Sequence, residues 1–298
     1  MTERECDVID EFHTIRDWLR WAVSNFNRAG LVYGHGTTRA LDDAAFLILE
    51  TLGLPIDELD PWLDARLTRV ERGAICEVIT KRIKTRKPAS YLTGSAYIQG
   101  RRFRVDERVI VPRSYIGELI GTGRLDDVIV GDPPGILDLC TGSGCLAILA
   151  ALRFGGRVDA VELSADALAV ARENVAVYNL EDRVRLLQGD LFEPVRGERY
   201  DLIIANPPYV ASGEVDAFSP EYKSEPVLAH LGGTDGLDLV RRILEGASQH
   251  LNPEGTLVME IGTGREELEA AYPELPFLWL DTEESEGEVL MIEGEELT

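Results

Sequence analysis

Short apolar runs alternate with helical patterns in the second half of this chain, and this alternation constrains the fold more than any other feature. The runs GILDLC (135–140), VDAVEL (158–163) and YDLIIA (200–205) are strand-like, and helical patterns such as 165–180 stand between them. Strands that alternate with helices are typical of a parallel sheet covered by helices on both faces. The tail over 277–293 instead predicts two strands joined by an acidic turn, which fits an antiparallel edge.

The first 88 residues follow a helical period instead. Apolar and aromatic side chains from Phe12 to Phe26 recur at helical spacing, and a second helical run covers 41–52. A third helix is predicted to start at Thr68, whose spacing to Glu71 fits a capping box. The stripe of Trp and Phe side chains predicts the core of a helical bundle rather than a ligand site.

The stretch 89–111 separates these two patterns. Its short β-like pieces are broken by Gly100, which predicts a hairpin or a small sheet. We therefore expect a helical docking domain (1–88), a linking β-hairpin (89–111) and an α/β domain (112–298).

Composition limits the class of protein. No apolar run approaches the roughly 20 residues of a membrane helix, and the first residues, MTERECDVIDE, are too polar for a secretory signal. The spacing of the cysteines and histidines fits neither a disulfide framework nor a zinc site, so we expect a cytoplasmic protein without a metal. The cysteines are Cys6, Cys76, Cys140 and Cys145, and the histidines are His13, His35, His230 and His250.

The net charge of −23 argues against general electrostatic binding of nucleic acid. Charge is uneven, however, because the basic strip (66–113) holds 13 Lys or Arg and 4 Asp or Glu, a balance of +9. A solvated helix face followed by an arginine-rich hairpin explains this strip. The alternative is that the strip contacts RNA, while the acidic remainder favours a basic protein partner.

Polar residues follow four of the predicted strands, and ligands of open α/β sheets bind beyond such strand ends. Asp138 opens the turn DLCTGSGC, in which Gly142 and Gly144 let the backbone approach a ligand closely. Glu162 stands 24 residues later, where an acid can bind ribose hydroxyls, and Asp190 follows the next strand. The fourth strand ends in an Asn-Pro-Pro-Tyr tetrad.

The tetrad Asn206-Pro207-Pro208-Tyr209 predicts a rigid binding cup. A residue before proline is held extended, which fixes the direction of Asn206, and Pro207 is itself followed by a residue without an N–H. The Asn206 side-chain oxygen and the Pro207 carbonyl are adjacent acceptors that suit the two hydrogens of a planar –NH₂ group. Tyr209 offers an aromatic face. Because an amide or base amine is a poor nucleophile, a near-attack pose with acceptors for the developing charge is the help it needs.

Two other classes fit parts of this pattern. Read as G-x-G-x-x-A from Gly142 to Ala147, the turn also fits an NAD-dependent oxidoreductase or a nucleotide-binding module, which leaves the cup unexplained. Methylation of an exocyclic amine of adenine or cytosine does fit the cup. Such enzymes must also flip the base and usually need a wide basic surface.

With DLCTGSGC before it, NPPY resembles the motifs of the class I S-adenosylmethionine-dependent N-methyltransferases. The segments YLTGSAYIQGRRFRVDERVIVPRS, EDRVRLLQGDLFEP, PEYKSEP and GTDGLDLVRRIL resemble the protein-glutamine N-methyltransferases, and the likeness covers about residues 12 to 292. It implies a Rossmann-like, mostly parallel seven-stranded sheet with an antiparallel edge strand, preceded by a small helical domain and a linking hairpin.

The resemblance also implies the roles of the site residues, with S-adenosylmethionine as the cofactor. Asn206 and the Pro207 carbonyl are expected to orient the glutamine amide, while Pro208 and Tyr209 shape the pocket. The expected cofactor-binding residues are Asp138, Thr141, Gly142, Ser143, Gly144, Glu162, Asp190 and Asn206.

Arg113 and Glu260 are substrate-binding candidates on the same resemblance. A structural salt bridge is the alternative for both, because structural ion pairs also place charged residues near strand ends. Tyr115 departs from the pattern, which leads us to expect a proline there.

The form VDERVIVPRS resembles the family members that act on large-subunit ribosomal protein three. Members that act on peptide chain release factors typically carry a different stretch after PR. The expected reaction is therefore methyl transfer to a glutamine side-chain nitrogen of ribosomal protein three, with the GGQ glutamine of release factors as the alternative substrate. RNA contact through the basic strip is a further expectation.

Overall fold

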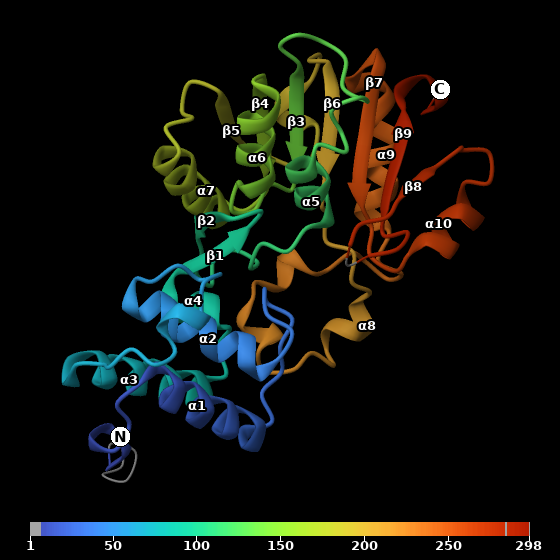
Figure 1. Ribbon diagram of the computed structural model, residues 1–298. Helices are drawn as coiled ribbons and strands as arrows, with labels where there is room; N and C mark the ends of the chain where they lie inside the picture. The colour runs from blue at the N-terminus through green and yellow to red at the C-terminus, as the bar shows by residue number, and fades with distance from the viewer. Residues whose placement is uncertain (1–6, 284, 298) are drawn as a thin grey trace. The chain divides into compact units, whose positions relative to one another are not determined.

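Seven strands form the central sheet of the computed structural model, which describes residues 7–283 and 285–297 (Figure 1). Across the sheet the strands are β5 (Val184–Gln188), β4 (Arg157–Glu162), β3 (Gly135–Leu139), β6 (Tyr200–Ala205), β7 (Leu251–Glu260), β9 (Val289–Glu293) and β8 (Leu278–Leu280). Neighbouring strands from β5 to β7 pair in parallel, and β9 pairs antiparallel with β7 and β8. The predicted fold class is confirmed.

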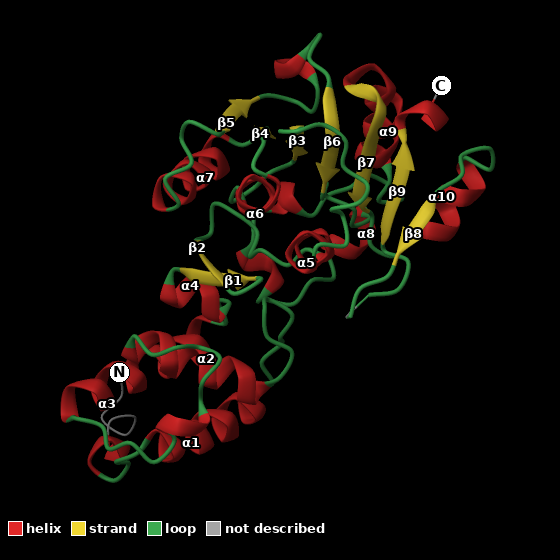
Figure 2. Cartoon of the chain, turned by 45° about the horizontal axis from the view of Figure 1, so that its top comes forward, coloured by secondary structure: helices red, strands yellow, loops and turns green. Residues whose placement is uncertain are grey.

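Helices cover both faces of this sheet (Figure 2). One face packs against α5 (Tyr115–Thr122), α6 (Cys145–Phe154) and α7 (Ala165–Val177), and the other packs against α9 (Asp238–His250) and α10 (Arg265–Ala271). Side chains alternate along each strand, so successive residues of β3 enter opposite cores. The single turn α8 (Ser212–Val215) follows β6.

The described residues fall into two compact units. The helical unit consists of residues up to Ala96 together with Phe218–Ser224, and the α/β unit consists of Tyr97–Ala217 together with the residues from Glu225 onward. The division passes through the stretch 89–111, which the sequence sets apart. That the helical part docks a substrate stays a prediction.

The predicted hairpin is shorter than the stretch assigned to it. Strands β1 (Ser95–Ile98) and β2 (Arg101–Arg104) pair with each other, and the short helix α4 (Ala89–Thr93) precedes them. Short 3₁₀ helices occupy Asp7–Asp10, Asp60–Trp62, Glu193–Val195, Tyr222–Ser224, Val227–Ala229 and Gly294–Leu297.

Three long helices form the helical unit, α1 (Ile15–Ala29), α2 (Ala40–Leu52) and α3 (Arg69–Thr85). The capping box predicted at the start of α3 is confirmed, because the Glu71 N–H donates to the Thr68 hydroxyl and the Thr68 N–H donates to the Glu71 carboxylate. Trp18 and Phe26 have no exposed surface, so the aromatic stripe is the core of this unit.

A buried ion pair joins α2 and α3 inside the helical unit. The Arg82 Nε donates to the Asp43 carboxylate at 2.9 Å, and both side chains are almost fully buried. Asp43 also accepts from the Thr37 hydroxyl, while Arg82 donates to the carbonyls of Val32 and Arg86. Every polar group of the pair is therefore satisfied, which is the condition for keeping a charge in a core.

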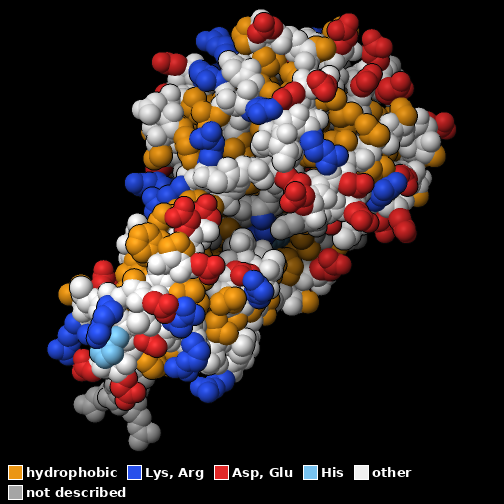
Figure 3. Space-filling view, in the orientation of Figure 1, with side chains coloured by type: hydrophobic (Ala, Val, Ile, Leu, Met, Phe, Trp, Pro, Cys, Tyr) orange, Lys and Arg blue, Asp and Glu red, His pale blue; other side chains and the backbone are white. Residues whose placement is uncertain are grey.

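The basic strip is less cationic than its sequence indicates. On the drawn face of the helical unit, Lys and Arg side chains lie among Asp and Glu side chains (Figure 3). Several arginines of the strip are engaged with carboxylates of their own unit, namely Arg82, Arg86, Arg104, Arg108 and Arg113.

No helix in residues 7–283 and 285–297 is long and apolar enough to cross a membrane. The same described ranges contain no group of three or more His, Cys, Asp or Glu side chains arranged to hold a metal ion. Cys140 and Cys145 are free thiols, whereas Cys6 and the rest of the first six residues lie outside the described part of the chain.

We expect Asp43→Ala to lower the free energy of unfolding of the helical unit by about 3 kcal/mol, because the buried Arg82 guanidinium loses its hydrogen-bonded carboxylate and keeps only the Glu221 carboxylate, at 4.0 Å. Its neighbour Asp42 is the matched control, since its ion pair lies at the surface and its loss should change stability by less than about 0.5 kcal/mol. Urea unfolding followed by tryptophan fluorescence measures both variants. Equal losses would contradict the role given to the buried pair.

Candidate active site

The turn after β3 brings the glycine motif to the carboxyl edge of the sheet. Cys140, Gly142 and Gly144 have φ angles of +60°, +55° and +80°, a left-handed region that glycine adopts without strain. Gly144 precedes the first residue of α6, and a Cβ there would lie 3.2 Å from the Ala171 Cβ of α7. At Gly142 nothing lies within 4 Å of the Cβ position, so the backbone there borders open space.

Asp138 is fully buried and holds this turn from within the protein. Its Oδ2 accepts hydrogen bonds from the Thr141 hydroxyl and, at 3.0 Å, from the Ala147 N–H. Its Oδ1 is also buried and has no hydrogen-bond partner within the described residues. Burial raises the pKa of Asp138 to about 7. Ser143 is buried as well, and its carbonyl accepts from the Asn174 amide.

Glu162, at the end of β4, connects two loops of the site. One carboxylate oxygen accepts from the Gly142 N–H at 2.9 Å and the other accepts from the Ser164 N–H at 2.8 Å. Burial raises the pKa of Glu162, and these two backbone hydrogen bonds oppose that shift. The acid therefore fixes the glycine turn next to its own loop.

Asp190, after β5, forms an ion pair that the sequence did not indicate. The Arg242 guanidinium on α9 donates to Asp190 Oδ2 at 2.8 Å. Both side chains are partly exposed, so the pair itself stabilises the fold little. Its effect is positional, because it leaves the second carboxylate oxygen of Asp190 available to a ligand.

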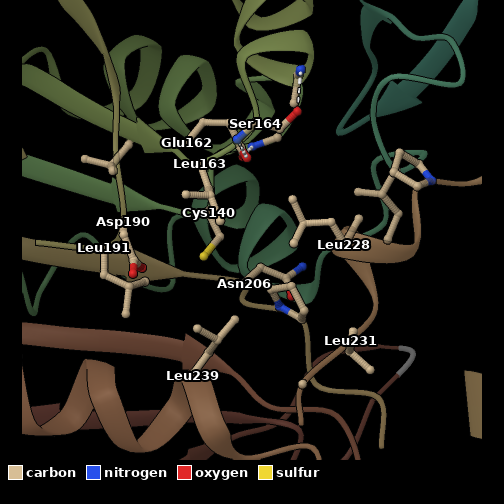
Figure 4. Close-up of a pocket in the computed structure, with 18 of the residues that line it drawn as sticks. Cys140, Glu162, Leu163, Ser164, Asp190, Leu191, Asn206, Leu228, Leu231 and Leu239 are labelled. Atoms are coloured by element: carbon tan, nitrogen blue, oxygen red, sulfur yellow. Dashed lines mark hydrogen bonds between the residues drawn. The ribbon is translucent and has the colours of Figure 1, made fainter. Parts of the chain in front are cut away.

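A pocket of about 430 Å³ lies over these strand ends (Figure 4). Five predicted site residues line it, namely Gly142, Glu162, Asp190, Asn206 and Pro208. The lining residues that the predictions omitted include Cys140, Leu163, Leu228, Leu231, Leu239 and Arg242. The remaining predicted residues are absent from the lining, namely Asp138, Thr141, Ser143, Gly144, Pro207, Tyr209, Arg113 and Glu260.

Asn206 stands at the centre of this pocket, directly after β6 (Figure 4). In the described part of the chain its side-chain amide has no hydrogen-bond partner, so its acceptor and donors are available to a ligand. Pro207 is buried behind it. The backbone after the tetrad is fixed by the Val210 N–H, which donates to the His230 carbonyl, and by the Gly232 N–H, which donates to the Val210 carbonyl, both at 2.9 Å.

The Tyr209 hydroxyl points to Glu260 at the end of β7 and donates to its Oε1 at 3.3 Å. The other carboxylate oxygen of Glu260 accepts from the Ser114 hydroxyl at 2.8 Å and from the Tyr115 N–H at 3.0 Å. A proline at 115, which the family pattern led us to expect, has no N–H and cannot make this bond. A Cβ on Gly262 would lie 2.8 Å from the Tyr209 ring, so the glycine leaves room for it.

Arg113 lies in a salt bridge. Its guanidinium donates to both oxygens of the Glu225 carboxylate at 2.8 and 2.7 Å. Glu225 is buried, accepts from the Val111 N–H, and lies 3.1 Å from the His230 Nε2. The arginine therefore joins the segment before α5 to the segment 225–230, which borders the pocket.

Proteins of known name match nearly the whole of this sequence. The ribosomal protein uL3 glutamine methyltransferase of Bradyrhizobium diazoefficiens is 52% identical over 297 residues, which cover 96% of this chain and 92% of that protein. The protein of the same name from Bordetella pertussis is 51% identical, with 96% and 97% covered. The chain belongs to the protein glutamine methyltransferase family.

A family model described as "Methyltransferase small domain" also matches residues 124–219 of this glutamine methyltransferase. A solved methyltransferase from Pyrococcus furiosus is 20% identical, covers 64% of this chain and 88% of its own, and has a TM-score of 0.49. Membership of the glutamine methyltransferase family sets aside the oxidoreductase and nucleotide-binding alternatives for the glycine turn.

Sequence patterns did not reveal two ion pairs of this glutamine methyltransferase, because their partners are far apart in the chain. Arg242 and Asp190 are separated by 52 residues, and Arg113 and Glu225 by 112. Two neighbouring arginines on a predicted helix signal only a solvated face. The quoted segment PEYKSEP contains Glu225, but nothing local shows that its carboxylate is buried.

Burial raises the pKa of Glu260 to about 7, and the nearby charge of Glu288 acts in the same direction. Ionisation of Glu260 therefore lowers the stability of the folded protein. Between about pH 4.5 and 7 the folded chain keeps a proton that the unfolded chain has lost, so the free energy of unfolding falls as pH rises. Glu260→Gln does not titrate. We therefore expect the free energy of unfolding of Glu260→Gln, relative to that of the wild type, to increase by up to about 3 kcal/mol between pH 4.5 and 8.

Urea unfolding across this pH range measures the difference. Glu254→Gln, an exposed position on the same strand, is the matched control and should follow the wild type. Parallel curves for the wild type and Glu260→Gln would show that Glu260 is already ionised at low pH in the folded protein.

Proposed function

We propose that this enzyme transfers a methyl group from S-adenosyl-L-methionine to the side-chain amide nitrogen of a glutamine in ribosomal protein uL3. The relatives at 52% and 51% identity carry that substrate in their names. The observation that carries the chemistry is the unengaged Asn206 amide, which lies in the same pocket as Glu162 and Asp190 (Figure 4). Since ribosomal proteins are the substrate class, we place the reaction in the cytoplasm.

The pocket fits the adenosyl cofactor that the family implies. Its volume of about 430 Å³ is that of a small-molecule site. Glu162 and Asp190 retain acceptor capacity for ribose hydroxyls and for the adenine amine, since each oxygen has two lone pairs. Leu163, Leu191 and Leu239 offer apolar walls for a flat ring. The open backbone at Gly142 leaves room for the methionine part, because a Cβ there would project into this space.

The residues of the cup prepare the amide for reaction. When bound, S-adenosylmethionine supplies an electrophilic methyl group. In this proposal the Asn206 side-chain oxygen, which lines the pocket, and the carbonyl of the adjacent Pro207 accept hydrogen bonds from the two N–H groups of the glutamine amide and so hold its nitrogen. The same acceptors stabilise the positive charge that grows on that nitrogen, which then releases one proton to solvent. Neither needs to ionise, so this role is independent of pH.

Contact with RNA through the basic strip is a separate proposal. Arg66, Arg69, Lys81 and Arg101 are exposed, which supports a contact, but much of the remaining positive charge is paired within its own unit. Such a contact would weaken with added salt, because phosphate binding releases counterions.

We expect Asn206→Ala to retain S-adenosylmethionine binding, with a smaller change in Kd than Asp190→Ala, and to lose about 100-fold or more in kcat, because an acceptor for the reacting amide is lost. Asp190→Ala should instead weaken cofactor binding about tenfold, because a charged acceptor is lost. Asp182→Ala, an exposed position outside the pocket, is the control. Titration calorimetry and single-turnover methylation separate the effects; wild-type turnover in Asn206→Ala would refute the proposed role.

We expect label from methyl-labelled S-adenosylmethionine to enter one glutamine of uL3 in ribosomal extract from cells that lack the enzyme. Purified release factors are tested in parallel, and mass spectrometry locates the label. Label on a release-factor glutamine would keep the chemistry and change the substrate. Label found only in RNA or DNA would mean that the cup binds a base amine, which would overturn the proposal.

A further inference from the structure

Exposed aliphatic side chains border the pocket on one side. Val227, Leu228 and Leu231, here named the apolar rim, are 59%, 52% and 41% exposed. Leu228 and Leu231 are also part of the pocket lining. Figure 4 shows them on one side of Asn206, with Asp190 and Leu191 on the other. Asn206 therefore lies between the apolar rim and the side of the pocket that is proposed to bind the nucleotide.

The segment that carries the apolar rim has no formal charge apart from a histidine. Residues 226–233 read PVLAHLGG, without a single Asp, Glu, Lys or Arg, in a chain of which 28% is charged. His230, the one titratable residue among them, is buried against Glu225. A charged side chain placed on this surface would lose water and gain no ionic partner from the segment itself.

The apolar rim is held in place rather than loosely attached. Glu225, directly before the segment, is buried and bonded to Arg113 and the Val111 N–H. Val210 exchanges two backbone hydrogen bonds with this segment, to the His230 carbonyl and from the Gly232 N–H. The strand end that presents Asn206 and the surface that presents the leucines are thus one connected piece. Exposed aliphatic side chains that are grouped in this way, rather than scattered singly, are typical of a binding surface.

On the basis of the proposed function, we infer that the apolar rim binds the stretch of the protein substrate that flanks the reactive glutamine. The occupant is an extended, uncharged polypeptide segment, since such a segment must pass over the edge of the pocket to bring its glutamine to Asn206. The apolar rim then selects substrates by rejecting Asp, Glu, Lys or Arg next to that glutamine. This selection acts in addition to any binding of the enzyme to the rest of the substrate protein.

Two substitutions and a control test the inference on the full-length enzyme. Leu228→Asp and Leu231→Asp should each raise the KM for uL3 about tenfold or more, through the lost apolar contact and the unpaired charge. The Kd for S-adenosylmethionine and the Tm should not change, because both side chains are exposed and lie away from the nucleotide side. Val177→Asp, at a position 57% exposed outside the pocket, should leave all three values unchanged.

A charge exchange distinguishes direct contact from an indirect effect. In uL3 the residue next to the labelled glutamine is replaced by Asp or by Lys. The wild-type enzyme should disfavour both substrates about equally, whereas Leu228→Asp should recover the Lys substrate and not the Asp substrate. A structural disturbance would not produce this difference.

Three outcomes would overturn the inference. If Leu228→Asp weakens cofactor binding and leaves the KM for uL3 unchanged, the apolar rim belongs to the cofactor site. If it changes the sedimentation coefficient instead, a second copy of the chain covers the surface. If wild-type enzyme methylates uL3 but is indifferent to flanking charge, the inference fails while the proposed function stands; failure to methylate any glutamine would mean that the proposed function itself is wrong.

Discussion

Parallel pairing of β3 with β4 on one side and β6 on the other is the constraint on which the site depends. In this register Leu139 lies beside both Val161 and Ala205, so the three strands end level. Glu162 and Asn206 follow directly and reach the same edge of the sheet. Because parallel strands point the same way, one edge collects Glu162 and the Asn206 tetrad, the residues proposed to bind the cofactor and the amide, although they are far apart in the chain.

Carboxylates with little or no exposure then fix the loops at this edge. Glu162, Glu225 and Glu260 each accept a hydrogen bond from a backbone N–H of another loop. The desolvation of a carboxylate offsets most of what such bonds contribute, so their main effect is on position rather than on total stability. Loops held in this way need not reorganise when a ligand binds, which preserves affinity for the ligand.

The same connections unite the proposed parts of the reaction. Glu225 anchors the segment of the apolar rim, that segment hydrogen-bonds the strand end behind the cup, and Glu260 holds the Tyr209 hydroxyl away from the pocket lining. Burial raises the pKa of Tyr209 further above the working range, so its hydroxyl is neither an acid nor a base near neutral pH. The proposed chemistry therefore uses neutral acceptors, which suits a neutral amide substrate.

The sequence by itself determined the alternating strands and helices, the capping box at Thr68 and the position of the Asn-Pro-Pro-Tyr tetrad directly after a strand. These follow from side-chain periodicity, backbone sterics and hydrogen bonds that span a few residues, all of which are local. Only the tertiary structure decided that Arg113 joins Glu225, that Arg242 joins Asp190, and that the segment 226–233 borders the pocket. In each case the partners are set by how elements pack at the edge of the sheet. A sequence pattern gives no information on the spatial distance between side chains that are far apart in the chain.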